Sequence, residues 1–205
     1  MNKEKQIEKR EIGYDLGSWY SRKAKFYLRE ANSLLQSFKY PECITSFNTS
    51  IEFSLKAICA FLNEKHDPQH DISKELIHLS KKYLSYKENF SRLALISSRC
   101  VGANDSFRLI INYGNQESSV PATKIITIKD IETIKEDAFE VAKFLRFIEI
   151  KQMLSSEREV GILDGIFNKE NSKEIKCDIK KFTKFDIDDW EKGLLKCNND
   201  DIKYN

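Results

Sequence analysis

One stretch of the sequence, from about Pro41 to Leu62, constrains the fold more than any other, because its apolar residues recur with the period of an α-helix. The residues of this stripe are Ile44, Phe47, Ile51, Leu55, Ile58 and Leu62, with Cys43, Cys59 and Phe61 widening it. Steps of three and four residues place these side chains along one face of a helix. At ~1.5 Å per residue, such a helix is roughly 33 Å long, as long as a small domain is wide. We therefore expect it to lie at the centre of an antiparallel bundle.

Two helical segments are predicted next to this stretch. A helix from Ser18 carries apolar residues on one face and ends before Pro41, because the residue before a proline avoids the α region. The apolar residues of this face are Tyr20, Ala24, Tyr27, Leu28, Ala31, Leu34, Leu35 and Phe38. On the other side, after the loop at residues 63–70, a shorter helix is expected from Ile72 to Leu84.

The later helices are less regular. A fourth begins near Lys87, and Gly102 to Asp105 weaken its pattern, so that one kinked helix and two separate helices both remain open. A fifth is capped by Thr127 or Asp130 and carries a heptad-like seam. The residues of the seam are Ile131, Ile134, Ala138, Val141, Leu145 and Ile148. A last short helix is expected over 187–196, with Asp186 as its N-cap.

Together these segments predict an all-α protein, an antiparallel up-and-down bundle of four to five helices with a small C-terminal helical appendage. Residues 1–17 form a polar lead-in that is frayed or partly helical, residues 18–150 form the bundle and residues 151–205 form the appendage. Residues 1–151 hold 24 basic and 20 acidic residues, whereas residues 152–205 hold 10 and 12. The bundle is therefore mildly basic, and this leaves nucleic-acid binding open.

The five cysteines are too widely spaced for a metal site, and no histidine joins them in a ligand pattern, so we expect no metal and no cofactor. Cys59 lies within the apolar stripe, which is typical of a reduced, buried thiol. The charged N-terminus has no apolar segment of a signal peptide, and no stretch approaches the ~20 apolar residues that span a membrane. We therefore expect a cytoplasmic protein that makes no contact with a membrane.

The order of several short motifs resembles that of a known family. The helix that contains Glu52 and Lys56-Ala57 is followed by a loop with His70-Asp71 and by leucines at helical spacing. Further along come Arg108-Leu-Ile-Ile-Asn-Tyr113-Gly114, a loop with Val120-Pro121, and a helix with Asp137-Ala138 and Val141-Ala142. Over about residues 18–150 this arrangement resembles the HEPN domain (higher eukaryotes and prokaryotes nucleotide-binding), a helical up-and-down bundle.

The resemblance implies a homodimer and a link to RNA. Many HEPN proteins are ribonucleases, often toxins or defence effectors, whose active residues are an arginine and a histidine four to six positions apart in a basic cleft between protomers. Small prokaryotic members are often partnered with a minimal nucleotidyltransferase. In this chain Arg108 is followed after four residues by Tyr113, and no histidine lies at that spacing. With a pKa of ~10, tyrosine is a poor general base near pH 7.

The resemblance gives two sets of candidate site residues. Arg108 and Tyr113 are the candidate catalytic pair, or bind RNA as a phosphate ligand and a base-stacking ring. The candidates for a nucleotide-binding cleft are Glu52, Lys56, Arg99, Arg108, Asn112 and Tyr113. Structural alternatives remain open for each: Glu52 and Lys56 form an i,i+4 ion pair, and Arg92 and Arg99 lie on a solvated helix face.

Three functions follow as hypotheses. The first is an RNA- or nucleotide-binding module, weakly catalytic or non-catalytic, in a toxin–antitoxin or defence setting. The second is a metal-independent ribonuclease that uses Arg108 and Tyr113, with Glu52 or Lys56 as a further candidate for the role of the missing histidine. The third is a structural partner of a nucleotidyltransferase, in which Tyr113 is a target of modification. His70 and Asp71 are expected to cap the third helix, and His66 and His78 to lie on the surface.

Overall fold

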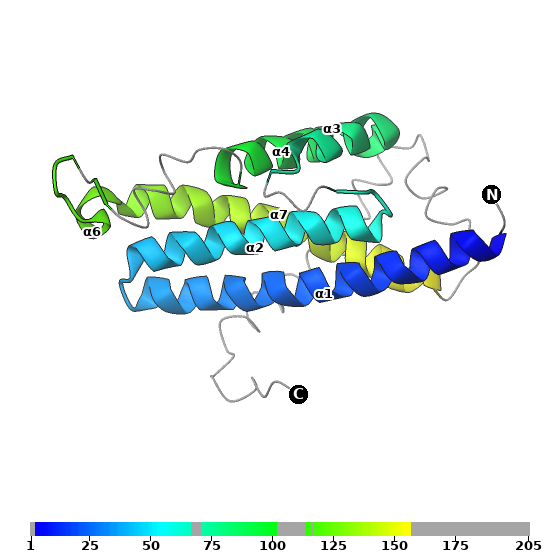
Figure 1. The fold of residues 1–205 in the computed structure, drawn as a ribbon, viewed down its shortest axis with the longest axis horizontal. Coiled ribbons are helices and arrows are strands. Elements are labelled where there is room, and N and C mark those ends of the chain that lie inside the picture. The colour runs from blue at the N-terminus through cyan, green and yellow to red at the C-terminus, as the bar shows by residue number, and fades with distance from the viewer. Residues whose placement is uncertain (1–2, 67–70, 102–113, 116, 157–205) are drawn as a thin grey trace.

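The computed structural model describes residues 3–66, 71–101, 114–115 and 117–156, and side chains within 13–66, 71–100, 114–115 and 117–151. Three long helices, α1 (Lys3–Gln36), α2 (Tyr40–Phe61) and α7 (Ile128–Ser156), lie side by side (Figure 1). The shorter α3 (Ser73–Lys82) and α4 (Lys87–Ile96) pack against each other along one side of them. The described residues form no strand, only an isolated bridge between Asn115 and Val120. The predicted all-α bundle is confirmed.

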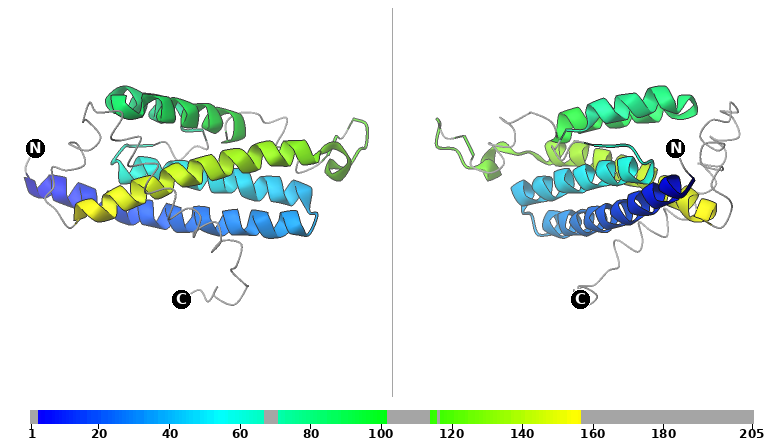
Figure 2. Two further views of the ribbon diagram at one scale, coloured as in Figure 1. Left: turned by 180° about the vertical axis from the view of Figure 1, so that it is seen from behind. Right: turned by 45° about the vertical axis from the view of Figure 1, so that its right-hand side comes forward.

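Helix α2 lies at the centre of the bundle because its apolar stripe is shielded from solvent along its whole length. Ile44, Phe47, Ile51, Leu55 and Ile58 have 0% exposure. On one side α2 packs antiparallel to α1, and on the other it packs along α7 (Figures 1 and 2). Full burial of each such side chain contributes about 1.5–3 kcal/mol relative to exposure. The prediction made from this stripe is therefore confirmed.

Helix α1 begins at Lys3, earlier than the start predicted at Ser18. Two glycines allow α1 to lie very close to the end of α2. A Cβ at Gly17 would lie 2.6 Å from the ring of Phe61, and one at Gly13 would lie 2.8 Å from the carbonyl oxygen of Ala60. The apolar pattern does not show this contact, because glycine has no side chain to contribute to a stripe.

The α1–α2 turn corrects one prediction. Phe38 was assigned to the buried face of the first helix, but α1 ends at Gln36 and Phe38 is 77% exposed. Phe38 adopts φ 57°, while the amide of Lys39 donates to the carbonyl of Leu34 at 3.0 Å. This is the Schellman end of a helix, in which the left-handed residue leaves the helix and its side chain turns outward.

The connection into α3 and α4 depends on one aspartate. Asp71 Oδ1 accepts hydrogen bonds from the amide of Ser73 at 2.9 Å and from the hydroxyl of Ser97 at 3.0 Å. The N-cap position of α3 belongs to Ile72, but the Asp71 carboxylate binds the first amide of the helix, so Asp71 helps to fix its start. His70 lies outside the described residues. A 3₁₀ turn, η1 (Leu84–Tyr86), leads into α4, which passes into a π-helical turn, η2 (Ser97–Val101). The continuation toward Ile111 also lies outside the described residues.

The start of α7 follows the short helix α6 (Ala122–Ile125). Both candidate caps of α7 contribute: the amide and hydroxyl of Thr127 donate to Asp130 Oδ2 at 2.8 and 2.6 Å. These bonds hold the pKa of Asp130 below its ordinary value. Every residue of the predicted seam in α7 is buried. The predicted helix at 187–196 lies outside the described residues.

No helix of the described residues is both long and apolar enough to cross a membrane.

Candidate functional site

The Glu52–Lys56 pair lies on α2 and is well shielded. Lys56 Nζ lies 2.7 Å from Glu52 Oε1, and the two side chains are only 8% and 12% exposed. Both belong to a helix that is otherwise largely apolar. Removing two charges from water carries a desolvation cost that their mutual attraction does not reliably repay. The ion pair is therefore weak evidence for stability, and its geometry places the Lys56 ammonium directly beside the Glu52 carboxylate.

Arg99 lies on η2 and is directed toward α7. It donates a hydrogen bond to Asp137, whose side chain is 2% exposed. Arg92 lies 3.3 Å from the same carboxylate and 3.2 Å from Glu140. The thiol of Cys100 lies 3.4 Å from the Asp137 carboxylate. We call Arg92, Arg99, Asp137 and Glu140 the α4–α7 clamp, because they join these two parts of the bundle.

Three of the predicted site residues, Arg108, Asn112 and Tyr113, lie outside the described residues. Of the other three, Glu52 and Lys56 form one cluster on α2, while the carboxylate that holds Arg99 belongs to α7. The described residues thus bring together the first two and assign Arg99 to the α4–α7 clamp.

His66 is a neighbour of this pair that the sequence analysis assigned to the surface. It is half-buried, and its Nε2 lies 3.4 Å from the hydroxyl of Tyr20. Burial and the nearby positive charge of Lys56 lower the pKa of His66, so its ring is neutral at pH 7. A neutral imidazole can accept a proton. His66 lies in an irregular loop, and no periodic pattern connects it with Tyr20, 46 positions earlier. His78, by contrast, is exposed as expected.

A group of rings lies beside His66, and sequence reasoning did not single it out. It consists of Trp19, Tyr20 and Tyr27 of α1 with Phe53 of α2, and we call it the α1–α2 aromatic cluster. Phe53 is its centre: its ring centroid lies 5.8 Å from that of Tyr27, 5.9 Å from that of Tyr20 and 6.1 Å from that of Trp19. The available signal was the repeat of aromatic pairs at 19–20 and 26–27, two helical turns apart.

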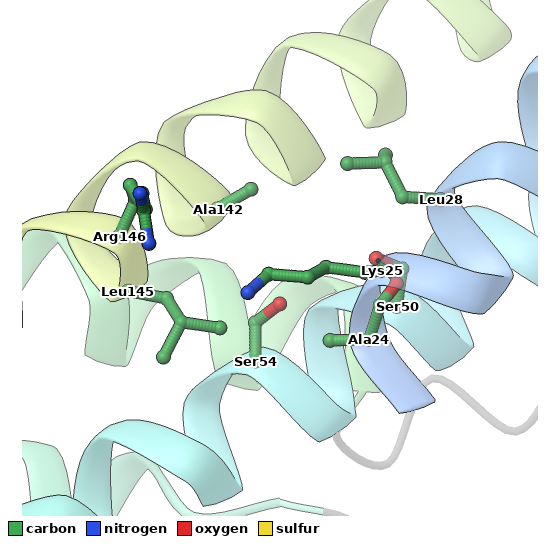
Figure 3. A pocket seen from close by; sticks show the side chains of 8 residues that line it. All are labelled: Ala24, Lys25, Leu28, Ser50, Ser54, Ala142, Leu145 and Arg146. Carbon is green, nitrogen blue, oxygen red and sulfur yellow. Dashed lines mark hydrogen bonds between the residues drawn. The ribbon is translucent and has the colours of Figure 1, made fainter. Parts of the chain in front are cut away.

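A small cavity lies where α1, α2 and α7 meet (Figure 3). Its volume is about 10 Å³, roughly the room that a single water needs. Lys25 extends across it from α1, and its Nζ lies 2.8 Å from Glu149 Oε1 on α7. Ser21 also donates to Glu149. This cavity is too small for a nucleotide, and its polar residues join α1 to α7.

The described residues hold no group of three or more potential metal ligands. Cys43, Cys59 and Cys100 are free and buried. Burial raises the pKa of Cys43 to about 11 and, with the charge of Asp137, that of Cys100 to about 12. Burial also raises the pKa of Cys59. These thiols are therefore protonated at neutral pH and unsuited to act as nucleophiles.

Comparison with known proteins gives one match. The family model of the HEPN domain matches residues 18–148, which is more than half of the chain. Searches of curated proteins and of solved structures found no match.

Proposed function

The chain belongs to the HEPN domain family, and from that premise we propose that it is an RNA- or nucleotide-binding module whose cleft contains Lys56 and Glu52. The observation that carries the proposal is the shielded ion pair on α2, with Lys56 8% exposed and neutral His66 nearby. An ammonium held in place by a carboxylate can bind phosphate without first losing rotamer freedom. Arg108, Asn112 and Tyr113 complete the cleft in this proposal, together with Arg99 where it is exposed beyond the α4–α7 clamp.

The proposal includes a biological setting. The module acts as a homodimer in the cytoplasm, in a toxin–antitoxin or defence system, and is weakly catalytic or non-catalytic because Tyr113 stands where the family's nuclease histidine is expected. Large apolar residues left exposed on α3, α4 and the turn between them support a dimer. They are Ile77, Leu84 and Leu95, at 45%, 73% and 55% exposure. A second copy would cover such residues.

The first test exchanges the two charges of the pair. The double variant Glu52→Lys/Lys56→Glu keeps an ion pair on α2 but moves the ammonium by one helical turn. We expect the variant to fold and to bind a fluorescein-labelled mixed-sequence RNA about ten-fold more weakly, because a close charged contact contributes ~1.5–3 kcal/mol. Binding should also weaken as salt rises, and Arg108→Ala should reduce it.

The matched control is Lys129→Glu/Glu132→Lys, which exchanges the same two residue types at exposed positions of α7. It should bind like the unmodified protein. If the exchange on α2 and Arg108→Ala both leave the affinity unchanged in folded protein, the proposed cleft is wrong.

A second function, metal-independent RNA cleavage, is favoured by the place of His66, which is half-buried near Lys56 with its pKa lowered by burial and by that charge. In this alternative Arg108 binds the scissile phosphate, and Tyr113 or His66 accepts the proton of the attacking 2′-hydroxyl. Cleavage of RNA by the purified dimer, abolished by Arg108→Ala and by His66→Gln, would support it. Intact RNA after prolonged incubation would exclude it.

The third alternative is a structural partner of a minimal nucleotidyltransferase. Co-purification with such an enzyme and a mass increase at Tyr113 would support it. Failure of the protein to bind RNA would distinguish it from the proposed RNA-binding module.

A further inference from the structure

One ring of the α1–α2 aromatic cluster is exposed, while the other three are half-buried. Trp19 is 45% exposed although its ring contacts both Tyr20 and Phe53. Behind it, the rings of Tyr27 and Phe53 are nearly parallel, with an angle of 7° between their planes. The edge-on contacts with Tyr20 and Phe53 hold the Trp19 ring in place and leave much of its surface to solvent. A ring supported in this way can accept a planar group at little cost in conformational entropy.

Basic residues surround Trp19 on the outer side of α1. Lys23 Nζ lies 5.8 Å from the centroid of the Trp19 ring. Arg22 lies one turn after Trp19, and Arg29 lies two turns after Arg22, so the helix presents them on the same side. No ion pair among the described residues includes any of the three, although the helix carries Asp15 and Glu30 at the two ends of this stretch. Water therefore solvates these cations, and their charges stay open to an anionic ligand.

Phe26 extends the arrangement along the helix. It lies two turns after Trp19, about 10 Å away along the axis, and packs edge-on against Tyr27 with ring centroids 5.2 Å apart. Aromatic and basic side chains thus alternate along the outer side of α1, in the order Trp19, Arg22 with Lys23, Phe26, Arg29. We call these five residues the α1 outer face.

We propose that the α1 outer face binds single-stranded RNA, with a base stacked on Trp19 and backbone phosphates bound by Arg22, Lys23 and Arg29. The proposal rests on the function proposed above and adds a second contact region and a preference for unpaired strands. Stacking on aromatic rings and phosphate contacts with cations are together the way in which proteins bind single strands without reading their sequence. Duplex RNA offers phosphates, but its bases are not free to stack on a protein ring.

A second copy of the chain fits this surface less well. In a two-fold symmetric dimer the same patch is present on both protomers. Arg22 and Arg29 of one protomer would then approach the same cations of the other, and like charges in contact cost several kcal/mol at an interface. RNA supplies the negative charges that a second copy lacks.

The test uses Trp19 as its own reporter. The chain has two tryptophans, so Trp190→Phe leaves Trp19 as the one indole fluorophore. We expect a twelve-nucleotide oligoadenylate to quench this fluorescence, because a stacked base contacts the indole, and the matching twelve-base-pair duplex to quench it far less. Trp19→Leu, which keeps an apolar side chain, should weaken binding of the single strand about ten-fold.

The cations are tested separately. Arg22→Gln/Arg29→Gln should weaken binding of the oligoadenylate and reduce the slope of log affinity against log salt by about 1.4, since each phosphate contact to a single strand contributes about 0.7. The matched control is Lys81→Gln/Lys129→Gln, which removes two exposed cations from α3 and α7. Its affinity and slope should change by less than half as much.

The outcomes separate the two proposals. If Arg108→Ala weakens RNA binding while Trp19→Leu and Arg22→Gln/Arg29→Gln do not, the α1 outer face is not an RNA surface and the proposed cleft stands. If neither oligonucleotide binds the unmodified protein, both proposals fail. If Trp19→Leu instead shifts the dimer–monomer equilibrium in sedimentation without changing RNA affinity, the surface is an interface between copies and the inference is overturned.

Discussion

The cations of the α4–α7 clamp and those of the α1 outer face look alike in the sequence but have opposite surroundings. Arg92 and Arg99 are 41% and 43% exposed, yet both are bound to Asp137, which is almost completely buried. Arg22 and Arg29 are also exposed, and no carboxylate of the described residues pairs with them. The positive charge of the first pair is compensated within the fold, whereas that of the second remains available to a ligand.

Because the two pairs of arginines differ in their partners, the number of basic residues on a helix does not by itself identify a binding surface. The spacing of Arg92 and Arg99, seven positions apart, equals that of Arg22 and Arg29. What separates the two pairs is a carboxylate on another helix, 38 and 45 positions away from the arginines that it binds. RNA can therefore bind Arg99 only in competition with the Asp137 carboxylate.

The largest expected effect comes from removing that carboxylate. Asp137→Asn keeps the shape of the side chain but loses the charge that binds two guanidinium groups and faces the Cys100 thiol. We expect it to lower the free energy of unfolding by about 1.5–3 kcal/mol, the range for hydrogen bonds that involve charged groups. Urea unfolding followed by circular dichroism measures this.

The same variant also tests the comparison. With Asp137 neutral, Arg92 and Arg99 become available, and binding of RNA should become stronger rather than weaker. An unchanged stability would show that the α4–α7 clamp does not hold the two helices together, and the distinction between the two sets of cations would then lose its basis.

The fold could be predicted almost entirely from periodicity. The stripes of α2 and α7 report burial directly, since a helix that hides one face must place apolar residues at steps of three and four. Phe38 is the instructive error. Its position continued the apolar spacing of α1, but the helix had already ended. The left-handed position at such a helix end is usually occupied by glycine, so a phenylalanine there gives no sequence signal for the end of the helix.

The candidate site could be predicted only in part. Glu52 and Lys56 were identified because two charges interrupt an apolar pattern on one helix. The contacts of His66 with Tyr20, of Tyr27 with Phe53, and of Arg99 with Asp137 each join different elements. Such contacts depend on how helices pack against each other, and a one-dimensional pattern contains no information on that geometry. Arg108 and Tyr113 remain predictions.

A smaller effect on stability is expected from His66. Unlike the arginines of both regions, it has surroundings that disfavour its positive charge. Its pKa in the folded protein is lower than its ordinary value of about 6.5, so the unfolded chain binds more protons in acid. The free energy of unfolding should therefore fall as the pH decreases below about 6.5. Below the pKa of His66 in the folded protein, this histidine should cause no further loss.

Replacement by Gln removes this contribution. Unfolding measured between pH 7 and pH 5 should show a shallower loss of stability in His66→Gln than in the unmodified protein. His78→Gln, at an exposed histidine of α3, is the matched control and should keep the original slope. Equal slopes in all three proteins would mean that the surroundings of His66, including the charge of Lys56, do not disfavour the imidazolium.

The smallest expected effects compare exposed charges of the two regions. Glu140 pairs with Arg92 at 3.2 Å, but both side chains are more than 40% exposed, so Glu140→Gln should change the free energy of unfolding by less than about 0.5 kcal/mol. Arg22→Gln/Arg29→Gln should be equally small, and of either sign, because no partner is lost. The salt dependence of unfolding distinguishes the two variants. The free energy of unfolding of Glu140→Gln should depend less on ionic strength than that of the unmodified protein, because an exposed ion pair is lost. A loss of more than 1 kcal/mol in Arg22→Gln/Arg29→Gln would show that these arginines already have a partner within the protein, and the α1 outer face would then resemble the α4–α7 clamp.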